Sequence, residues 1–462
     1  MKNHFYSRVA RIALPVALQS LLQSSFSVID QLMIGQLGSQ SIAGVGLGGK
    51  FASLYSVLLG AVATAAGIMI SQYTGQKNER ETSRSFFANT GIAAGVALFF
   101  FFVCVFFSEN IMQLYTKDAG TKRLAGEYLR IYAFSYLPMA LGSITSVLLR
   151  CMEAASLPLY ASLLSVLLNT GLNYLLIFGK GGFPVLGIKG AALATVISQF
   201  AACGLILILF IRQYRKQDMR LSFLWRFDRE SRVQYLGILC PLLICEFLWS
   251  LGENVYAAIY GNMGTDPCAA MTLTIPVQTL LIGALSGISQ AAGIMIGKTL
   301  GKGEYERAKK ESVGLMLLGF GGSLILSLFL IAARSFYAGI FRVESDVQEL
   351  ARQILLAFAL IAPVKVQNMI LGGGIIRSGG KTKYIMWIDF IGTWFAGVPL
   401  GLLAAFVWKL SIPYVYFILS LEECLRWGIS MAVFKRGIWI HSLRTTEEGK
   451  ADSSVSAADA GA

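Results

Sequence analysis

The sequence has 462 residues, of which 55% are hydrophobic and 14% are charged, and its net charge is +13. A soluble domain carries about 25% charged residues, so this chain lacks the polar side chains that a fully hydrated surface would need. We therefore expect lipid to surround much of the chain. Its basic residues form short runs between apolar stretches, which is typical of membrane proteins and argues against nucleic-acid binding.

Twelve apolar segments follow one another along the chain, many of them near the length of about 20 residues that crosses a membrane. Seven are free of charge, and the other five carry or adjoin one charged residue. The sequence predicts spans at residues 12–29, 51–76, 86–107, 131–149, 154–179, 190–211, 233–245, 267–297, 312–333, 353–364, 390–408 and 410–421.

The basic residues also predict an orientation. With the N-terminus in the cytoplasm, the inner segments hold 26 Lys and Arg and the outer loops hold 8. Positive residues favour the cytoplasmic side, so we expect a multi-pass protein of the bacterial inner membrane with both termini inside. No cleavable signal peptide is visible. The expected divisions are an N-lobe (1–211), a basic cytoplasmic linker (212–232), a C-lobe (233–435) and a largely disordered tail (436–462).

The two halves of the chain repeat each other. The string AAGIMI occurs at Ala65–Ile70 and at Ala291–Ile296, and the same offset of 226 residues carries Pro15 onto Pro241. Repeated halves are a transporter design. The predicted fold is therefore an all-α integral membrane protein with two six-helix lobes around a central cleft.

Asp30 ends the first apolar segment, fifteen residues after Pro15, which should bend the helix. A charged group inside a membrane is costly and usually faces water or a partner. Asn169 and Asn173 are four residues apart, on one face of the fifth span, and could complete a cation or proton site with Asp30. The alternatives are a helix cap near the outer interface for Asp30 and simple interhelical hydrogen bonding for the asparagines.

A second group of charges lies in the other half. Glu246 and Glu253 are seven residues apart on one face of the seventh span, and Lys365 is the expected partner. Either a structural salt bridge or a carboxylate that binds a cation or a drug would fit them. Lys50 and Asp389 are expected near the ends of their spans and are assigned no role.

Several patterns argue against enzymatic chemistry. The chain has two histidines, one near each end, and none of its seven cysteines forms a CxxC pair. Gly44–Lys50 matches a phosphate-binding loop, but Phe51 replaces the required Ser or Thr and the segment opens a span instead of following a strand. We expect no cofactor, no catalytic residue and no metal site beyond a possible Na⁺ at Asp30.

At this point the chain resembles the multidrug and toxic compound extrusion (MATE) family. The resemblance runs from about Arg8 to Lys435 and depends on motif order together with the repeat. The segments that carry it are Ala13–Gln19, Asp30–Gly38, Gln72–Gly75, Asn169–Asn173 with Leu176–Gly179, Gly190–Thr195, Tyr260–Thr265 and Ile376–Thr382.

The resemblance implies an antiporter that exports lipophilic, often cationic drugs or metabolites in exchange for H⁺ or Na⁺. We expect membrane lipids to be its other partners and the monomer to be the functional form. It places the coupling cation at Asp30, Asn169 and Asn173, and it gives Glu246 a role. Two positions depart from the family pattern. Ala191 stands where some members have a hydroxyl or thiol, with Thr195 one turn further on, and the tenth span has Lys365 and Gln367 where sodium-coupled members have an aspartate.

Three rivals stay open. A lipid-linked oligosaccharide flippase of the same superfamily should carry more basic residues inside its spans, where this sequence shows only Lys50 and Lys365 away from span ends. A membrane enzyme should show histidine or paired-acid motifs at the membrane surface. A channel is disfavoured by the two-lobed repeat, which is typical of transporters.

Overall fold

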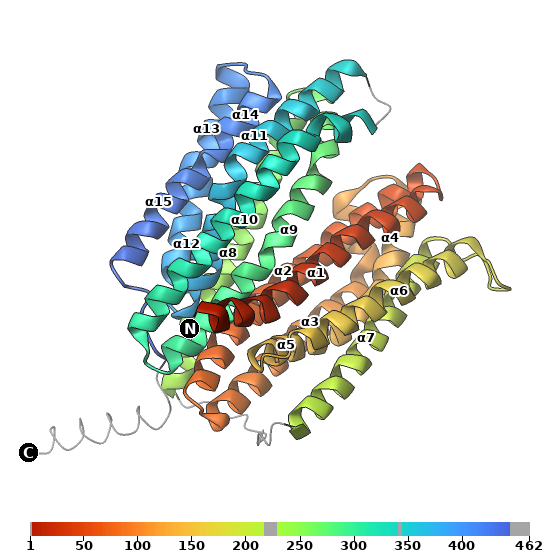
Figure 1. The fold of residues 1–462 in the computed structure, drawn as a ribbon. Helices are drawn as coiled ribbons and strands as arrows, with labels where there is room; N and C mark the ends of the chain where they lie inside the picture. The colour runs from red at the N-terminus through yellow and green to blue at the C-terminus, as the bar shows by residue number, and fades with distance from the viewer. Residues whose placement is uncertain (1, 217–228, 341–343, 444–462) are drawn as a thin grey trace, which may run out of the picture. The chain divides into compact units, whose positions relative to one another are not determined.

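The computed structural model describes residues 2–216, 229–340 and 344–443, and every regular element in that part of the chain is a helix (Figure 1). The apolar segments of the first half form seven α-helices and one short 3₁₀ turn. They are α1 (Lys2–Gly35), α2 (Ser39–Gly75), α3 (Glu79–Tyr115), α4 (Ala119–Tyr132), η1 (Ala133–Ser135), α5 (Tyr136–Cys151), α6 (Ser156–Phe178) and α7 (Ile188–Lys216).

The second half repeats this order, with eight α-helices and three π-helical segments in its described part. They are α8 (Arg229–Gly261), α9 (Thr265–Gly301), α10 (Tyr305–Ile340), α11 (Ser345–Ile370), η2 (Leu371–Ile376), α12 (Thr382–Phe390), η3 (Ile391–Gly397), α13 (Val398–Leu402), η4 (Leu403–Val407), α14 (Ile412–Ser420) and α15 (Glu422–Lys435). The π segments widen the helix by one residue per turn, and such widenings often mark functional sites.

The predicted number and order of spans is confirmed. Within the described residues, ten helical segments are long and apolar enough to cross a membrane. The 34-residue α1 and the pair α14 and α15 supply the other two. The predicted span ends are less accurate, because α8 continues through Glu246 to Gly261 and α15 carries the twelfth span beyond Glu422 to Lys435.

The chain forms two compact units that differ from the predicted lobes at two places. The N unit is Leu18–Ile70 with Glu79–Arg226, and the C unit is Met1–Ala17 with Ser71–Asn78 and Phe227–Ala462. The first half of α1 and the last turn of α2 therefore belong with the second repeat. The linker residues 217–228 lie outside the described residues.

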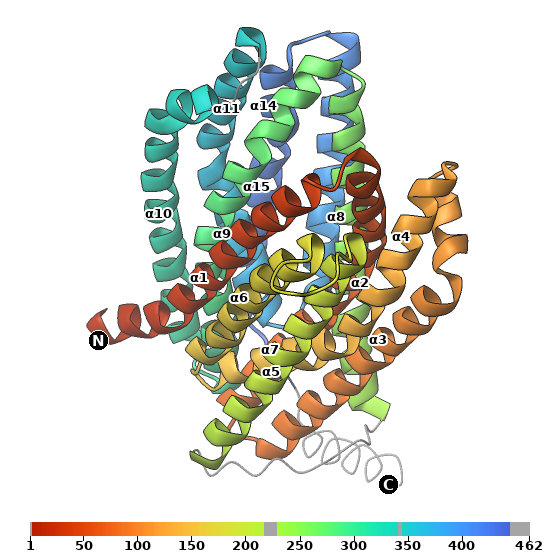
Figure 2. The ribbon, with the colours of Figure 1, turned by 90° about the vertical axis from the view of Figure 1, so that its right-hand side faces the viewer.

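Close packing of α6 against α7 positions the polar residues of the N unit. A Cβ atom at Gly190 would lie 2.7 Å from the carbonyl carbon and oxygen of Leu176, so only glycine allows this approach of the two backbones. The two helices run side by side in both views (Figure 2). The facing sides of α6 and α7 consequently bring Asn169 and Thr195 within reach of each other.

In the C unit, the ends of α2 and α9 also meet at glycines. A Cβ atom at Gly75 would lie 2.2 Å from the Lys298 carbonyl oxygen, and one at Gly301 would lie 2.1 Å from the Gln72 carbonyl oxygen. These two glycines are related by the 226-residue offset. The repeat has thus placed matched small residues where two helix ends cross.

Part of the predicted tail is packed instead of disordered. Trp439 is fully buried and Leu443 is 3% exposed. The buried Gln72 side chain donates to the Ser378 and His441 carbonyl oxygens at 2.6 and 3.3 Å and accepts from the Leu443 backbone N–H at 2.7 Å. Residues 444–462, the rest of the predicted tail, lie outside the described residues.

Candidate functional site

A chain of polar side chains crosses three helices of the N unit at Asp30. The Asn173 amide nitrogen on α6 donates to Asp30 Oδ1 on α1 at 2.6 Å and to Asn169 Oδ1 at 2.8 Å. The Asn169 amide nitrogen donates in turn to the hydroxyl oxygens of Thr195 at 3.1 Å and Ser198 at 3.4 Å on α7. The four predicted coupling residues therefore form one connected site.

This N-unit site holds a carboxyl without a basic partner. Among the described residues, no Lys or Arg forms an ion pair with Asp30. Asn173 is fully buried, and its Oδ1 atom has no hydrogen-bond partner in the described part of the chain. A buried acceptor left unpaired costs free energy, so the arrangement is suited to receive a proton donor or a small cation.

The surroundings of Asp30 separate the two interpretations made from the sequence. Asp30 lies within α1, which continues to Gly35, and its carboxylate accepts from another helix, so it does not cap a helix end. Helix α1 is unbroken through Pro15, and the predicted bend stays a prediction. Tyr128 and Tyr132 on α4 lie close enough to Asp30 for its charge to act on their hydroxyl groups.

Ser198 was not predicted, although a signal exists. It follows Thr195 by three residues, so both hydroxyls lie on one face of the same helix. The asparagines do hydrogen-bond between helices, as the structural alternative requires. That bonding includes Asp30, and hence a structural and a coupling role are compatible here.

The C unit contains a different arrangement, a network of acids and bases that we call the C-unit ion network. Asp389 on α12 pairs with Arg426 on α15 and lies 4.0 Å from Arg377, which in turn lies 3.3 Å from Glu246 on α8. The Cys245 thiol donates to Asp389 Oδ2 at 2.8 Å. Asp389, assigned no role from the sequence, is therefore the centre of the network.

Lys365 belongs to the same network, and its ion-pair partner is a glutamate that the sequence analysis did not name. Its amino group lies 3.8 Å from Glu423 on α15, and Glu253 attracts it electrostatically without forming an ion pair. Glu423 also lies 3.6 Å from Arg426 and accepts from the Asn368 amide at 2.7 Å. The sequence analysis ended the twelfth span at residue 421, and it therefore did not predict Glu422 or Glu423 as buried site residues.

The other two second-half predictions form no ion pair with a described residue. Glu253 is exposed and forms no ion pair with a described residue. Gln367 is buried and donates its amide to the Met316 carbonyl oxygen on α10 at 2.9 Å, which is a contact between helices. Lys50, like Glu253, has an exposed side chain.

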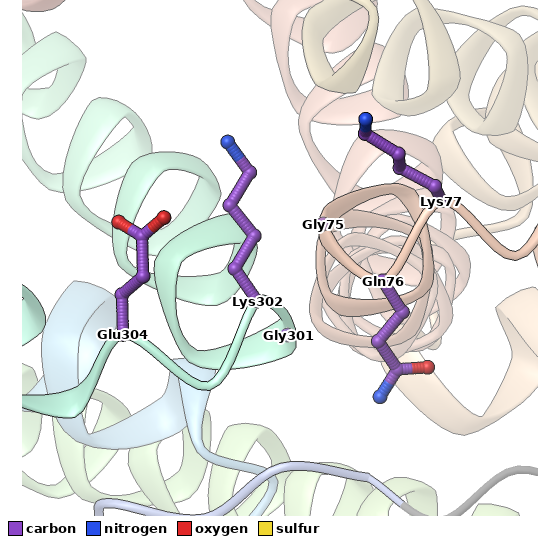
Figure 3. Close-up of a pocket in the computed structure, with 6 residues that line it drawn as sticks. All are labelled: Gly75, Gln76, Lys77, Gly301, Lys302 and Glu304. Carbon is purple, nitrogen blue, oxygen red and sulfur yellow. The ribbon is translucent and has the colours of Figure 1, made fainter.

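A hollow of about 500 Å³ lies at the crossing of α2 and α9. It is lined by the turns that follow the two helices, with Gln76, Lys77, Lys302 and Glu304. Figure 3 shows Lys77 and Lys302 extending in the same direction, while Gln76 points the opposite way. The lining is polar, and none of the predicted site residues reaches it.

Twelve spans, a repeat of the first six and polar groups buried inside the helices define a multi-pass membrane protein of the transporter class. A family comparison gives the family. The model of the MatE family matches residues 15–175 and again residues 241–403. The chain therefore belongs to the MATE family of transporters, and the second match begins 226 residues after the first, as the internal repeat predicts.

Curated relatives and solved structures agree with this assignment. The chain is 23% identical over 418 residues to the probable multidrug resistance protein NorM of Agrobacterium fabrum, covering 89% of this chain and 88% of that protein. It is 24% identical to the probable NorM of Thermotoga maritima, covering 93% and 92%. A crystal structure of MATE in complex with MaL6 superposes with a TM-score of 0.84 at 16% identity, covering 93% and 96%.

A further solved structure is also similar in fold. It is a MOP superfamily transporter from Pyrococcus furiosus, described as having a binding pocket of reversed polarity, with a TM-score of 0.83 at 16% identity. The match covers 93% of this chain and 95% of that one. At these identities the two structures support the twelve-helix fold alone, which confirms the predicted fold class.

Proposed function

We propose that this chain is a secondary active antiporter that exports lipophilic, often cationic compounds in exchange for H⁺ or Na⁺. The observation that carries the proposal is the N-unit site, where, among the residues that the structure describes, Asp30 has no basic partner and Asn173 has an unpaired buried oxygen. The names of the curated relatives support small-molecule drugs as the exported class. We place the protein in the bacterial inner membrane with both termini in the cytoplasm.

In this proposal, Asp30 is neutralised when one cation binds and becomes negatively charged when that cation leaves. Binding of H⁺ or Na⁺ would neutralise the carboxylate and satisfy the free oxygen of Asn173. Because Asp30 on α1 is bonded to α6, a change in its charge would alter how these helices hold each other. A ligand that binds one conformation better than another shifts the population toward it, and this coupling would drive alternating access.

The decisive experiment measures flux in purified protein reconstituted into vesicles. Ethidium or norfloxacin efflux should respond to an imposed proton or sodium gradient, and Asp30→Asn should abolish that response at equal protein level. The ion whose gradient drives the flux is the coupling ion. Efflux at the wild-type rate in Asp30→Asn under both gradients would refute the coupling role of Asp30.

The flippase alternative is less well supported by the C-unit ion network. The sequence showed few basic residues inside the spans, and the structure adds Arg377 and Arg426. Both of these arginines, and Lys365, are paired with carboxylates and so are not free to bind a phosphate-bearing lipid. The fold is shared with a MOP superfamily transporter, so a rescue assay of cell-wall synthesis is a useful second test.

A further inference from the structure

Glu422 is a buried carboxyl at the start of α15, in the middle of the twelfth span. It is 5% exposed. Its hydrogen-bond partner within the described residues is the hydroxyl of Tyr256 on α8, which donates to Glu422 Oε2 at 2.8 Å. This pair is separate from the N-unit site, because Asp30 belongs to the other compact unit.

The charges around Glu422 leave it without a basic partner. In the described chain, the C-unit ion network contains three bases, Lys365, Arg377 and Arg426, and their ion pairs use the three acids Glu246, Asp389 and Glu423. Glu422 forms none of these ion pairs, although it is adjacent to Glu423. A buried carboxylate without a paired cation is strongly disfavoured, whereas the neutral acid with one hydrogen bond is not.

The groups that face Glu422 do not change this conclusion. Arg426 and Lys365 attract the carboxylate at distances longer than an ion pair, and the hydrogen bond from Tyr256 also favours it, whereas Glu423 repels it. These attractions act against the cost of removing the carboxylate from water, which is the largest effect on Glu422. No titratable residue occurs in η2 or η3. The titratable and charged groups that interact with Glu422, Tyr256 or their direct neighbours are Glu253, Tyr256 and Tyr260 on α8, Lys365 on α11, Asp389 on α12, Tyr416 on α14, and Glu423 and Arg426 on α15.

The backbone beside the pair is shaped to admit it. A Cβ atom at Gly397 would lie 2.0 Å from the Tyr256 hydroxyl and 2.5 Å from Glu422 Oε2. Gly397 ends the π-helical segment η3, so a widened turn with no side chain lies directly against the two polar groups. Widened turns of this kind recur at functional sites, and here the absence of a side chain at Gly397 allows the pair to lie against the backbone.

We propose that Glu422 is a second proton-binding carboxyl, which exchanges its proton with water during transport. In the neutral state the acid and the Tyr256 hydroxyl hold α8 and α15 together. Loss of the proton leaves a carboxylate that is stable only in contact with water, so this contact must open for release. The inference rests on the proposed antiport function and adds a site in the other half of the repeat.

The protonation itself can be tested without transport. Infrared difference spectra of the reconstituted protein, taken between acidic and alkaline buffer, should show a carboxylic-acid C=O band in an Asp30→Asn background. The band should disappear in Asp30→Asn with Glu422→Gln and stay in Asp30→Asn with Glu423→Gln. Tyr256→Phe should shift the band, because it removes the hydrogen bond but keeps the acid. A band unchanged by Glu422→Gln would overturn the proposal.

The transport role needs a separate measurement. In otherwise wild-type protein, Glu422→Gln should flatten the pH dependence of drug efflux, and Tyr256→Phe should move its midpoint even if the glutamine variant is poorly folded. Glu349→Gln, an exposed acid on α11, is the matched control and should leave the profile unchanged. A wild-type pH profile in both Glu422→Gln and Tyr256→Phe would show a purely structural acid and refute the inference, while leaving the role of Asp30 untouched.

Discussion

Asp30 and Asp389 are both carboxyls inside apolar helices, but the two units surround them in opposite ways. Asp30 is bonded to a neutral amide and continues into a chain of amides and hydroxyls. Asp389 is held by Arg426 and Arg377. The two halves share one helix order, so the difference between them is that Asp389 is paired with basic side chains, whereas Asp30 is hydrogen-bonded to a neutral amide.

The comparison shows that two repeats with the same helix order can place a carboxyl that exchanges a cation in one half and a carboxyl that joins helices in the other. A carboxyl with only neutral partners can gain and lose a cation, since no base fixes its charge. A carboxyl between two arginines is held ionised and mainly joins helices. We therefore expect changes in the N-unit site to alter transport and most changes in the C-unit ion network to alter stability, with Glu422 as the exception.

The largest effect is expected for Arg426→Met. This change leaves Asp389 and Glu423 buried with one base fewer, and breaking a buried ion pair costs about 3–5 kcal/mol. Thermal unfolding in detergent micelles measures the loss, and adding Asp389→Asn should recover part of it. Arg352→Met is the matched control, because its pair with Glu349 is exposed and contributes about 1 kcal/mol or less. Equal losses in the two arginine variants would break the distinction.

Gln72→Ala should have the next largest effect. It leaves the buried N–H of Leu443 and the Ser378 carbonyl oxygen unpaired, which costs about 1–3 kcal/mol for each unsatisfied group. The end of α2 belongs to the C unit, so hydrogen exchange should rise at residues 437–443. Gln353→Ala, on an exposed turn of α11, serves as the control. Unchanged exchange would show that α2 is not held by this segment.

Asn173→Ala tests the N-unit site, where we expect a loss of transport and a smaller loss of stability. It removes the hydrogen bond to Asp30 and the link to Asn169, and loss of a charge-assisted bond of about 1.5 kcal/mol corresponds to roughly tenfold slower efflux. Its thermal stability should fall by less than that of Arg426→Met. Asn254→Ala, whose amide bonds within its own exposed helix turn, should transport normally. Normal efflux in Asn173→Ala would contradict the coupling site.

The smallest effect is expected at Asp118, an exposed N-cap of α4. Hydrogen bonds from Thr121, and then from Gln40, hold the pKa of Asp118 below its ordinary value. The cap therefore stabilises α4 above the ordinary pKa and is lost as the pH falls through the lowered one. Asp118→Ala should loosen the first turn of α4 at neutral pH, seen by hydrogen exchange, and match the wild type in acid. Asp118→Asn keeps a good cap and should behave normally.

The sequence predicted the number of spans, the repeat and the connected residues of the N-unit site. The spans follow from local apolar length, and the pairing of Asn169 with Asn173 follows from residues four apart on one helix face. The connection of these asparagines to Asp30 was implied by the family resemblance. It failed where a charge was interpreted as a span end, as at Glu246 and Glu422. A helix continues past a charge when another helix compensates it, and partners such as Arg377 and Tyr256 lie 131 and 166 residues away.

The placement of α1 and α2 has a consequence for dividing the polypeptide. The first half of α1 and the last turn of α2 depend on the second repeat. Gly287 on α9 packs on the backbone of Ala13, and Gln72 bonds to the backbone of Leu443. Two fragments separated between α7 and α8 would each expose surfaces that only the other can cover. Such fragments should accumulate when co-expressed and be degraded when made singly, so a split-gene assay would report assembly of the whole molecule.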